Sequence, residues 1–539
     1  MAEELKDELT PESIWEEYQK GVEYNNAVDL YDNVEKCENF YIGKQWEGLN
    51  APDLPKPVIN VLRRVVSYFI AMLVSDDVSA LFTPFKETDE TKEECDILSK
   101  TVEEVIEGCN IKVMSREIVR DAAVDGDGAL YFYFDPNAES GQDAKGKIVA
   151  EVLDNTCVMF GNPYNKDLQT QDYITIAIKK TLKNVKAEAE ELGLSEDVIA
   201  NLKADADENM YNPADKDADE LVTVLLRFYK EDGKVWATKS TQDVMLKEPW
   251  DTGLTLYPIS FMRWDTMKNS YHGVSALLAM IPNQIAINQL FAMAIHHIKT
   301  MAFPKIIYDA TKIKGWSNKV GQAIGTHGNP NDAVANAFKA PDMSAQVMEL
   351  IENLIQKTLE FMGASDATLG NIKPDNTSAI IAVQQSTAVP LELQRLEYYR
   401  FTEEYIRIIV DIIRNNYGTR EVSTENEEGE TVIKNFDFGA ISVSNHNLSV
   451  DIGPSSYFSE IMQTQTLDNL FMKGILTDAT EYLERVPGKY LPGKAKLIES
   501  MKAKQTEAEQ AQQMPAPEQV PQGAMPMEGA MPPEMIPMA

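Results

Sequence analysis

Few residues in this sequence have the types and spacing needed for catalysis or cofactor binding. The pattern GxxxxGK[ST], whose backbone amides cradle phosphates, does not occur, and neither do GxSxG and HExxH. Of five histidines, only His296 and His297 are close in sequence. Neighbouring residues on a helix point about 100 degrees apart, so this pair is unsuited to chelation. We therefore expect no enzyme activity, no catalytic residue, no metal site and no cofactor.

Cysteines and carboxylates lead to the same expectation. The four cysteines are widely spaced and form no CxxC pair, so they indicate neither a zinc site nor a disulfide framework but a reducing compartment. The DGDG segment at 125–128 lacks the further ligands and the glutamate at position twelve of an EF-hand loop. It predicts a tight turn from a helix into a strand.

The charge balance limits the possible partners. A formal net charge of -35 over 539 residues argues against extensive wrapping of nucleic acid, because that binding depends on Lys and Arg neutralising phosphates. Any DNA contact must then be local.

The acidic start, MAEELKDELTPESIWEEY, differs from a basic and then apolar signal peptide, so we expect a cytoplasmic chain. Two arginines interrupt the apolar segment 58–74, and proline, amides and histidines interrupt 273–300. Both predict buried or inter-subunit helices and no membrane span.

In the first half of the chain, predicted helices precede a predicted sheet. Apolar residues at three- and four-residue steps predict an amphipathic helix over 11–37, and helices also follow over 61–74 and 93–125. Asn60, after two prolines, is a candidate cap for the second of these helices. Strand patterns then occupy 148–180 and 220–262, separated by an acidic helical insert at 181–209. This order predicts a mixed α+β fold without strict βαβ alternation.

The second half has a different texture. We expect one helix over 273–301, with Pro282 in its first turns or at a kink, and a helix of about forty residues interrupted at Pro390. The other predicted segments are an irregular insert at 303–342, a helix at 343–362, a turn-rich loop at 363–378, a hairpin region at 421–453, short helices at 455–504 and a disordered Met/Pro/Gln-rich tail from 512.

Two loops allow more than one interpretation. A basic run, Lys305, Lys312, Lys314 and Lys319, is either an ordinary surface loop or, repeated around a ring, a positive collar for an acidic partner or a phosphate backbone. The loop 363–378 is either a plain connection or a mobile element. In the second case Lys373, with Asn371, Asn376 and Thr377, would face a ligand.

Several short motifs, in order along the chain, resemble those of the portal proteins of tailed bacteriophages. YIGKQW followed by PKPVIN and an apolar helix is similar to that family's N-terminal pattern Y-x-G-x-Q-W and P-x-x-x-N. GDGALYFYFD resembles its helix-to-strand step, and YHGVSALLAMIPNQIAINQLFA resembles its G-x-S segment leading into a helix with Gln and Asn. The long helix after GNIKPDNTSAI resembles the one behind the tunnel loop. The resemblance covers most of residues 20–460.

This resemblance implies a portal-protein fold, and a ring of typically twelve subunits at one capsid vertex through which double-stranded DNA is packaged and ejected. It implies a wing, a two-helix stem, a small clip, a tunnel loop, a long kinked wing helix and a helical crown. The implied boundaries are 1–272 and 379–455 for the wing, 273–301 and 343–362 for the stem, 302–342 for the clip, 363–378 for the tunnel loop, 456–505 for the crown and 506–539 for the tail.

The resemblance also suggests roles for single residues. Asn371, Lys373, Asn376 and Thr377 would meet DNA in the channel. Clip residues would meet the packaging ATPase (large terminase) or the head-tail adaptor, and these are Lys312, Lys314, Trp316 and Lys319. Structural anchors would be Tyr41, Trp46, Asn60, Arg63, Arg64 and Pro390, with both arginines as candidates for salt bridges within or between subunits.

The remaining implied partners are the major capsid and scaffolding proteins, with assembly in the bacterial cytoplasm and a final place in the virion. Two rival functions stay open at this point. One is an enzyme acting on nucleic acid through a carboxylate-held metal, and the other is an assembly scaffold that is not a portal.

Overall fold

The chain divides into two compact units, Met1–Pro454 and Ser455–Ala539. The computed structural model describes residues 9–48, 50–74, 79–84, 88–142, 144–205, 221–301, 305–313, 315, 323–332, 335–338, 345–364, 389–425, 431–441, 446–451, 467, 469–473 and 482–483. The predicted crown helices fall mostly outside these residues and the predicted disordered tail entirely so. In the second unit the rings of Phe471 and Tyr482 are in contact, with centroids 4.9 Å apart. The elements below all belong to the first unit, which combines helices and sheets as the predicted α+β class requires.

The N-terminal region forms three helices, α1 (Pro11–Ala27), α2 (Leu30–Ile42) and α3 (Val61–Leu73). The single helix predicted over 11–37 is wrong, because the chain breaks at Asp29, which adopts a left-handed φ of 54°. The apolar spacing continues across this break, so periodicity alone gave no sign of it. Helix α1 packs Ile14, Tyr18 and Val22 on one face of the larger sheet.

The helix predicted over 93–125 is also two helices. Helix α4 (Asp89–Gly108) and helix α5 (Ile111–Asp125) meet at Asn110, which has a φ of 54°. Helix α5 ends at Gly126, with a φ of 106°, and strand β2 (Asp127–Asp135) begins at the next residue. The predicted helix-to-strand turn at DGDG is therefore confirmed.

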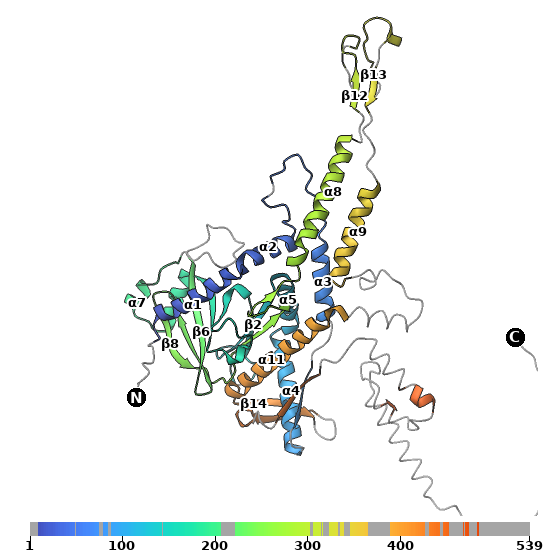
Figure 1. The fold of residues 1–539 in the computed structure, drawn as a ribbon. Helices are drawn as coiled ribbons and strands as arrows, with labels where there is room; N and C mark the ends of the chain where they lie inside the picture. The colour runs from blue at the N-terminus through green and yellow to red at the C-terminus, as the bar shows by residue number, and fades with distance from the viewer. Residues whose placement is uncertain are drawn as a thin grey trace, which may run out of the picture. The chain divides into compact units, whose positions relative to one another are not determined.

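Two sheets form the body of the unit (Figure 1). One has three antiparallel strands in the order β3-β2-β9, and the other has five in the order β4-β5-β6-β7-β8. Helices α5 and α11 contact the first sheet, and their apolar side chains share one large core with it. The strands are β3 (Lys147–Leu153), β4 (Val158–Phe160), β5 (Tyr173–Thr181), β6 (Leu221–Glu231), β7 (Lys234–Ser240), β8 (Met245–Asp251) and β9 (Ile259–Arg263).

The acidic insert forms two short helices, α6 (Leu182–Glu191) and α7 (Glu196–Ala200), and its residues from 206 onward lie outside the described residues. Val185 and Ala189 pack against β6 in a small separate core. Glu188 pairs with both Lys180 and Lys239. These contacts attach the insert to strands β5, β6 and β7 of the five-stranded sheet.

The helix predicted over 273–301 is corrected at its start. Residues 273–280 form β11 (Gly273–Val274), which pairs with β10 (Asp265–Thr266), and a 3₁₀ turn, while helix α8 spans Ile281–Met301. Pro282 lies in its first turn, where proline leaves no hydrogen bond unmade. Helix α9 (Ala345–Phe361) runs beside α8, and strands β12 (Lys305–Tyr308) and β13 (Ala335–Phe338) pair beyond the ends of both helices (Figure 1).

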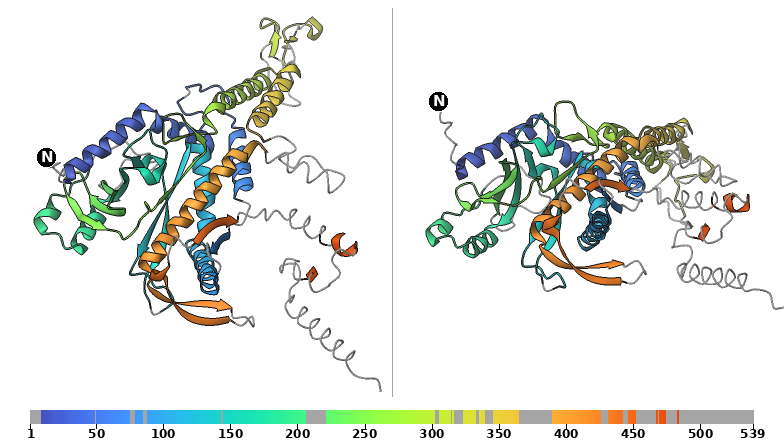
Figure 2. Two further views of the ribbon diagram at one scale, coloured as in Figure 1. Left: turned by 60° about the horizontal axis from the view of Figure 1, so that its bottom comes forward. Right: turned by 90° about the horizontal axis from the view of Figure 1, so that it is seen from below.

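Helix α11 (Glu392–Asn416) follows the 3₁₀ turn Val389–Leu391 that contains Pro390. The predicted continuation over 379–388 lies outside the described residues. Strands β14 (Thr419–Glu425) and β15 (Thr431–Asp437) form the predicted hairpin, which extends from the end of α11 (Figure 2). Strand β16 (His446–Asp451) pairs with β1 (Ser79–Pro84), far away in sequence. Further 3₁₀ turns are Asn155–Cys157, Leu168–Thr170, Leu278–Met280, Pro330–Asp332 and Phe438–Ala440.

A carboxyl between α11 and β9 makes stability depend on pH. Burial raises the pKa of Glu404 from 4.5 to about 7, although Arg400 and the Ser260 hydroxyl oppose the shift. The folded state thus holds a proton that the unfolded chain releases. This stabilisation is complete below pH 4.5 and is lost as the pH rises through about 7. Glu404→Gln mimics the protonated side chain and does not lose this stabilisation. The free energy of unfolding of the variant, relative to that of the parent, should therefore increase by up to about 3 kcal/mol as the pH rises between those two values.

Urea titrations at about pH 4.5 and about pH 8.5 measure this gain. The neighbouring half-exposed Glu403, paired with Arg407, provides the control, and Glu403→Gln should show little difference between the two pH values. Equal pH dependence in the parent and in Glu404→Gln would contradict the prediction.

Candidate functional site

Helix α8 is apolar but incompletely covered. Its residues Leu278–Thr300, including the preceding 3₁₀ turn, are long and apolar enough to cross a membrane, with a mean hydropathy of 1.3, and only 33% of the most apolar stretch is buried. One such helix is weak evidence for a membrane span. Ile285 is 36% exposed, and Met293 and Ile298 are each 53% exposed. Ile285, Gln289 and Met293 follow one another at four-residue steps, so they lie on one face of the helix. We call the two exposed apolar residues of this face, Ile285 and Met293, the α8 stripe.

Helix α9 has one buried face and one polar face. Ile351, Thr358 and Leu359 are buried and follow helical spacing, so this side packs inward. The residues at the opposite spacing are all exposed and polar, and they are Glu349, Asn353, Gln356 and Glu360. The two helices together therefore present an apolar stripe and a polar stripe that the described residues leave uncovered.

The start of α8 is held by buried amide side chains. Asn288 Nδ2 donates to Gln45 Oε1 at 2.6 Å, and Gln284 Nε2 donates to the Ile59 carbonyl at 2.6 Å. In return, Gln284 Oε1 accepts from Val61 N at 3.0 Å, and Asn288 Oδ1 accepts from Ile59 N at 3.3 Å. Gln284, Asn288 and Gln45 are 0%, 2% and 9% exposed. We call these three side chains the amide cluster, and buried amides need such partners because losing them leaves a desolvated polar group.

The predicted anchor residues surround the amide cluster. Asn60 caps α3, because its Oδ1 accepts from Arg63 N at 3.0 Å while its Nδ2 donates to the carbonyls of Phe40 and Tyr41. Trp46 Nε1 donates to the Pro57 carbonyl at 2.8 Å. The YIGKQW and PKPVIN segments are thus bonded to each other and, through the amide cluster, to α8.

The two arginines of α3 were predicted as partners in salt bridges within or between subunits, and the pairing between subunits stays a prediction. Within the described part of the chain, neither Arg63 nor Arg64 makes a salt bridge. Instead Arg63 lies over the Tyr41 ring at 5.8 Å, and Arg120 lies over the same ring at 5.0 Å. Arg120 also pairs with Glu38 and with Asp121. Burial raises the pKa of Asp121 to about 6 despite that pairing.

A second buried contact joins the sheet to the segment before α8. The Asp127 carboxylate is fully buried, accepts from Gly273 N and lies 2.6 Å from His272 Nδ1. His272 Nε2 lies 3.0 Å from Asn25 Oδ1, so α1 takes part as well. His272 is itself buried. Its contact with Asp127 joins residues 145 positions apart.

The loop predicted over 363–378 is described only at Gly363 and Ala364, and its role stays a prediction. An ideal Cβ on Gly363 would lie 2.7 Å from Pro390 Cβ, so the residues that flank 364–389 touch. The predicted ligand-facing residues Asn371, Lys373, Asn376 and Thr377 lie outside the described residues. At the base of this segment, Phe361 is 75% exposed, and Leu393 and Leu396 are 71% and 54% exposed.

The basic run is only partly described. Lys312 Nζ donates to the Asp332 carbonyl at 3.3 Å and lies 3.9 Å from the Asp309 carboxylate. Lys314, Trp316 and Lys319 lie outside the described residues. The described ranges contain no group of three or more His, Cys, Asp and Glu residues that could hold a metal ion.

Sequence reasoning missed the amide cluster and the Asp127–His272 contact. Two amides four residues apart in an otherwise apolar helix, Gln284 and Asn288, are the signal that could have identified the first. The second left no such signal, because one carboxylate among many and one histidine carry no pattern. Both sites lie where the α8 segment leaves the body of the unit, so they set the position of α8.

Comparison with known proteins fits this arrangement. The family model described as phage P22-like portal protein matches residues 17–535, nearly the whole chain. Comparison with curated protein sequences gave no match. The mixed helix-and-sheet fold, in which a small hairpin lies between two neighbouring helices in the chain order, is compatible with a portal fold. The chain belongs to the P22-like phage portal protein family.

Proposed function

We propose that twelve copies of this chain form the portal ring, with α8 and α9 as its two-helix stem. Membership of the family makes the chain a phage portal protein, a structural component that forms an oligomeric ring at a capsid vertex with capsid and terminase partners. In the proposed arrangement, assembly occurs in the host cytoplasm. Residues 1–272 and 379–455 form the wing, 273–301 and 343–362 the stem, 302–342 the clip, 363–378 the tunnel loop and 456–505 the crown.

The α8 stripe is the observation that supports the stem assignment. Exposed Ile285 and Met293 of this stripe, and Ile298 beyond it, would be unfavourable on a free helix in water but favourable against a neighbouring subunit. A closed ring needs two different complementary surfaces on each subunit, and the α8 stripe is one of them. This role accounts for the apolar composition of α8 without a membrane.

Met293→Glu tests the stem assignment. A glutamate in the centre of a subunit contact would be desolvated without a partner, so we expect the concentration needed for half-assembly to rise at least about 100-fold. Mass photometry over a concentration series measures the ring fraction. The matched control is Val113→Glu, because Val113 is 61% exposed and lies on α5. Rings that form equally well in Met293→Glu and in the parent would contradict the assignment.

The acidic surface suits a channel that DNA must pass through. A net charge of -35 gives a path with few phosphate contacts, and Lys373 in the proposed tunnel loop would be one of those contacts. Lys373→Glu should slow DNA packaging in an in vitro packaging reaction, since a phosphate contact becomes a repulsion. Exposed Lys357 on α9 is paired with Glu360, and Lys357→Glu serves as the control. Unchanged packaging in Lys373→Glu would remove this residue from the channel proposal.

The clip would be the docking platform for other chains. The β12–β13 hairpin lies beyond the ends of α8 and α9, away from the sheets, and Lys312 lies between its strands in sequence (Figure 1). Lys312, Lys314, Trp316 and Lys319 would meet the packaging ATPase first and the neck adaptor later. This role is tested by measuring how much purified large terminase is captured by parent rings and how much by Lys312→Glu rings.

A further inference from the structure

Polar atoms without a partner gather on one face of the five-stranded sheet. Among the described residues, seven buried side-chain nitrogen and oxygen atoms have no hydrogen-bond partner, and four of the seven belong to this face. The four atoms are Thr175 Oγ1, Arg227 Nη1, Thr238 Oγ1 and Ser240 Oγ. Both threonines and the serine are 0% exposed, and Arg227 is 7% exposed. Buried polar groups are normally hydrogen-bonded, so four exceptions in one place need an explanation.

Strand pairing places these four residues side by side. Thr175 on β5 is opposite Arg227 on β6, and Arg227 is opposite Thr238 on β7. Ser240 is two residues beyond Thr238 on β7, so it lies on the same face of the sheet. Directly opposite residues of antiparallel strands have Cβ atoms about 4.5–5.5 Å apart. The four side chains therefore form a continuous patch across three strands, which we call the polar row.

Helix α1 covers the polar row. It contacts β4 and β6, and apolar residues on the same face of the sheet pack against it (Figure 1). Arg227 donates from Nε and Nη2 to the Glu17 carboxylate on α1, at 2.6 and 3.1 Å. At the β4 end, Met159 is opposite Thr175, and an ideal Cβ on Gly21 of α1 would lie 2.6 Å from Met159 Cγ. The row is thus enclosed between this helix and the sheet.

The chemistry of the polar row selects a small neutral ligand. The charge of Arg227 is neutralised by Glu17, so an anion would lie beside a carboxylate without a cation of its own. A cation would face Arg227 Nη1, which can only donate hydrogen bonds. The three hydroxyl groups are uncharged, and each can both donate and accept. Water is the ligand that also both donates and accepts.

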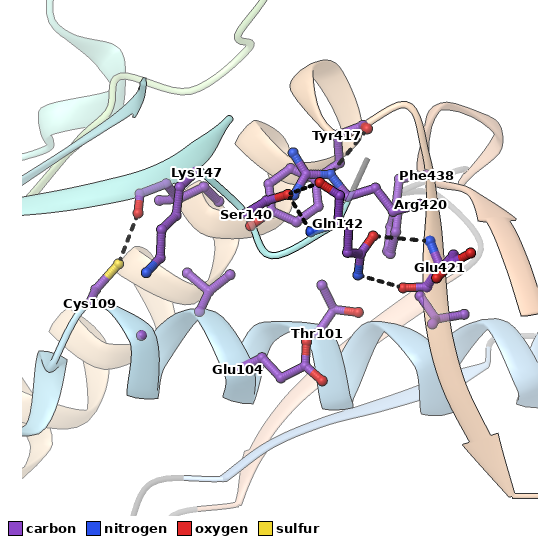
Figure 3. Close-up of a pocket in the computed structure, with 14 residues that line it drawn as sticks. Thr101, Glu104, Cys109, Ser140, Gln142, Lys147, Tyr417, Arg420, Glu421 and Phe438 are labelled. Atoms are coloured by element: carbon purple, nitrogen blue, oxygen red, sulfur yellow. Dashed lines mark hydrogen bonds between the residues drawn. The ribbon is translucent and has the colours of Figure 1, made fainter. Parts of the chain in front are cut away.

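A pocket elsewhere in the unit shows the opposite situation. It has a volume of about 210 Å³ and lies between α4 and β14 (Figure 3). There Gln142 Nε2 donates to the Glu421 carbonyl at 2.9 Å, and Gln142 Oε1 accepts from Glu421 N at 3.2 Å (Figure 3). Its lining carries both signs of charge, and none of the described residues that line it has a buried polar atom without a partner. That pocket therefore selects no ligand, whereas the polar row does.

We propose that the polar row is a buried hydration site, in which a short chain of water molecules between α1 and the sheet bonds the three hydroxyl groups and Arg227 Nη1. Buried water occurs on the order of once per 27 residues and makes about three hydrogen bonds to groups that lack other partners. A water molecule with two bonds of about 2.8 Å spans the separation of neighbouring positions in the row. The inference concerns a single chain, so it rests on neither ring assembly nor the stem assignment.

Removal of one hydroxyl group tests this proposal, because the sign of the effect differs between a hydrated and a dry row. Thr175→Val and Thr238→Val replace a hydroxyl by a methyl group of similar size. In a hydrated row each variant takes a partner from a buried water, and we expect the unfolding temperature of the full-length protein to fall by about 1–3 °C. In a dry row the variant removes a desolvated hydroxyl and should raise that temperature.

Thr402→Val is the matched control for the size of the effect. Thr402 is also 0% exposed, and its Oγ1 donates directly to the Tyr398 carbonyl at 2.8 Å. Its variant loses one direct hydrogen bond, so its unfolding temperature should fall by a similar amount. An unchanged or higher unfolding temperature in either Thr175→Val or Thr238→Val, beside a fall in Thr402→Val, would overturn the proposal.

A density map of the full-length protein, at a resolution that shows ordered water, examines the polar row without any variant. We expect separate density peaks at about 2.7–3.2 Å from Thr175 Oγ1, Thr238 Oγ1 and Arg227 Nη1. Empty density beside these side chains, in a map that shows water at other buried sites, would overturn the proposal. Crystals grown with bromide in place of chloride distinguish an anion from water. An anomalous bromide peak in the row would assign a halide ion to it and would also overturn the proposal.

Discussion

Replacing Asn288 by leucine is expected to lower the free energy of unfolding by about 3–5 kcal/mol. The substitution keeps the side-chain volume similar but removes an amide that bonds in three directions, to Gln45, Gln284 and Ile59 N. Gln45 Oε1 and Ile59 N would then be buried without a partner. Each such group costs about 1–3 kcal/mol. Burying the apolar leucine side chain offsets little of this cost, because the position is already closed to water. Urea denaturation followed by tryptophan fluorescence measures the change.

Gln289 provides the control on the same helix. It is the next residue, it is exposed, and it makes no hydrogen bond to a described residue. Gln289→Leu should therefore change the free energy of unfolding by less than about 0.5 kcal/mol. A loss below about 1 kcal/mol in Asn288→Leu would show that the amide cluster does not hold α8, because the released groups would then have found other partners. The contrast between neighbouring residues separates the cluster from helix propensity.

Local signals in the sequence predicted much of this fold. The DGDG turn, the capping position of Asn60 and the hairpin around ENEEGE each depend on residues within about ten positions, where turn chemistry and apolar spacing act. Pro282 was expected in the first turns of a helix or at a kink, and the first alternative is confirmed. The basic run and the polar loop that hold the proposed clip and channel residues were noticed from composition, but only the family resemblance gave these residues roles, and the roles stay predictions.

The parts that could not be predicted depend on contacts between distant residues or on unusual backbone conformations. Asp29 and Asn110 adopt a left-handed φ and split two predicted helices, although neither is glycine and the apolar spacing continues past them. Strand β1 pairs with β16 across more than 350 residues. The Asp127 carboxylate is buried only because His272 and Gly273 come to it from far along the chain. A periodicity argument cannot identify such partners, and the sequence shows them only once the fold is known.

Gly273→Ala is expected to destabilise the protein by at least about 3 kcal/mol, and in practice to prevent recovery of soluble chain. An ideal Cβ at this position would lie 2.4 Å from the Gly126 carbonyl oxygen and 2.9 Å from Asp127 Oδ1. Both are fixed, since Gly126 is the left-handed end of α5 and the Asp127 carboxylate bonds Gly273 N and His272. The methyl group would therefore displace backbone and not a flexible side chain. Soluble yield and thermal unfolding measure the outcome.

Gly315→Ala is the matched control, because no described residue lies within 4 Å of its ideal Cβ and no positive φ restricts the residue. It should leave the unfolding temperature within about 2 °C of the parent. If Gly273→Ala folds with parental stability, the segment before α8 can move away from α5 at little cost. The buried Asp127–His272 contact would then be incidental, and the amide cluster alone would have to fix α8 on the body. A clear loss in Gly273→Ala beside a neutral Gly315→Ala would instead mean that α8 is held at two separate points, by Asp127 at the preceding strand and by the amide cluster along its first turns.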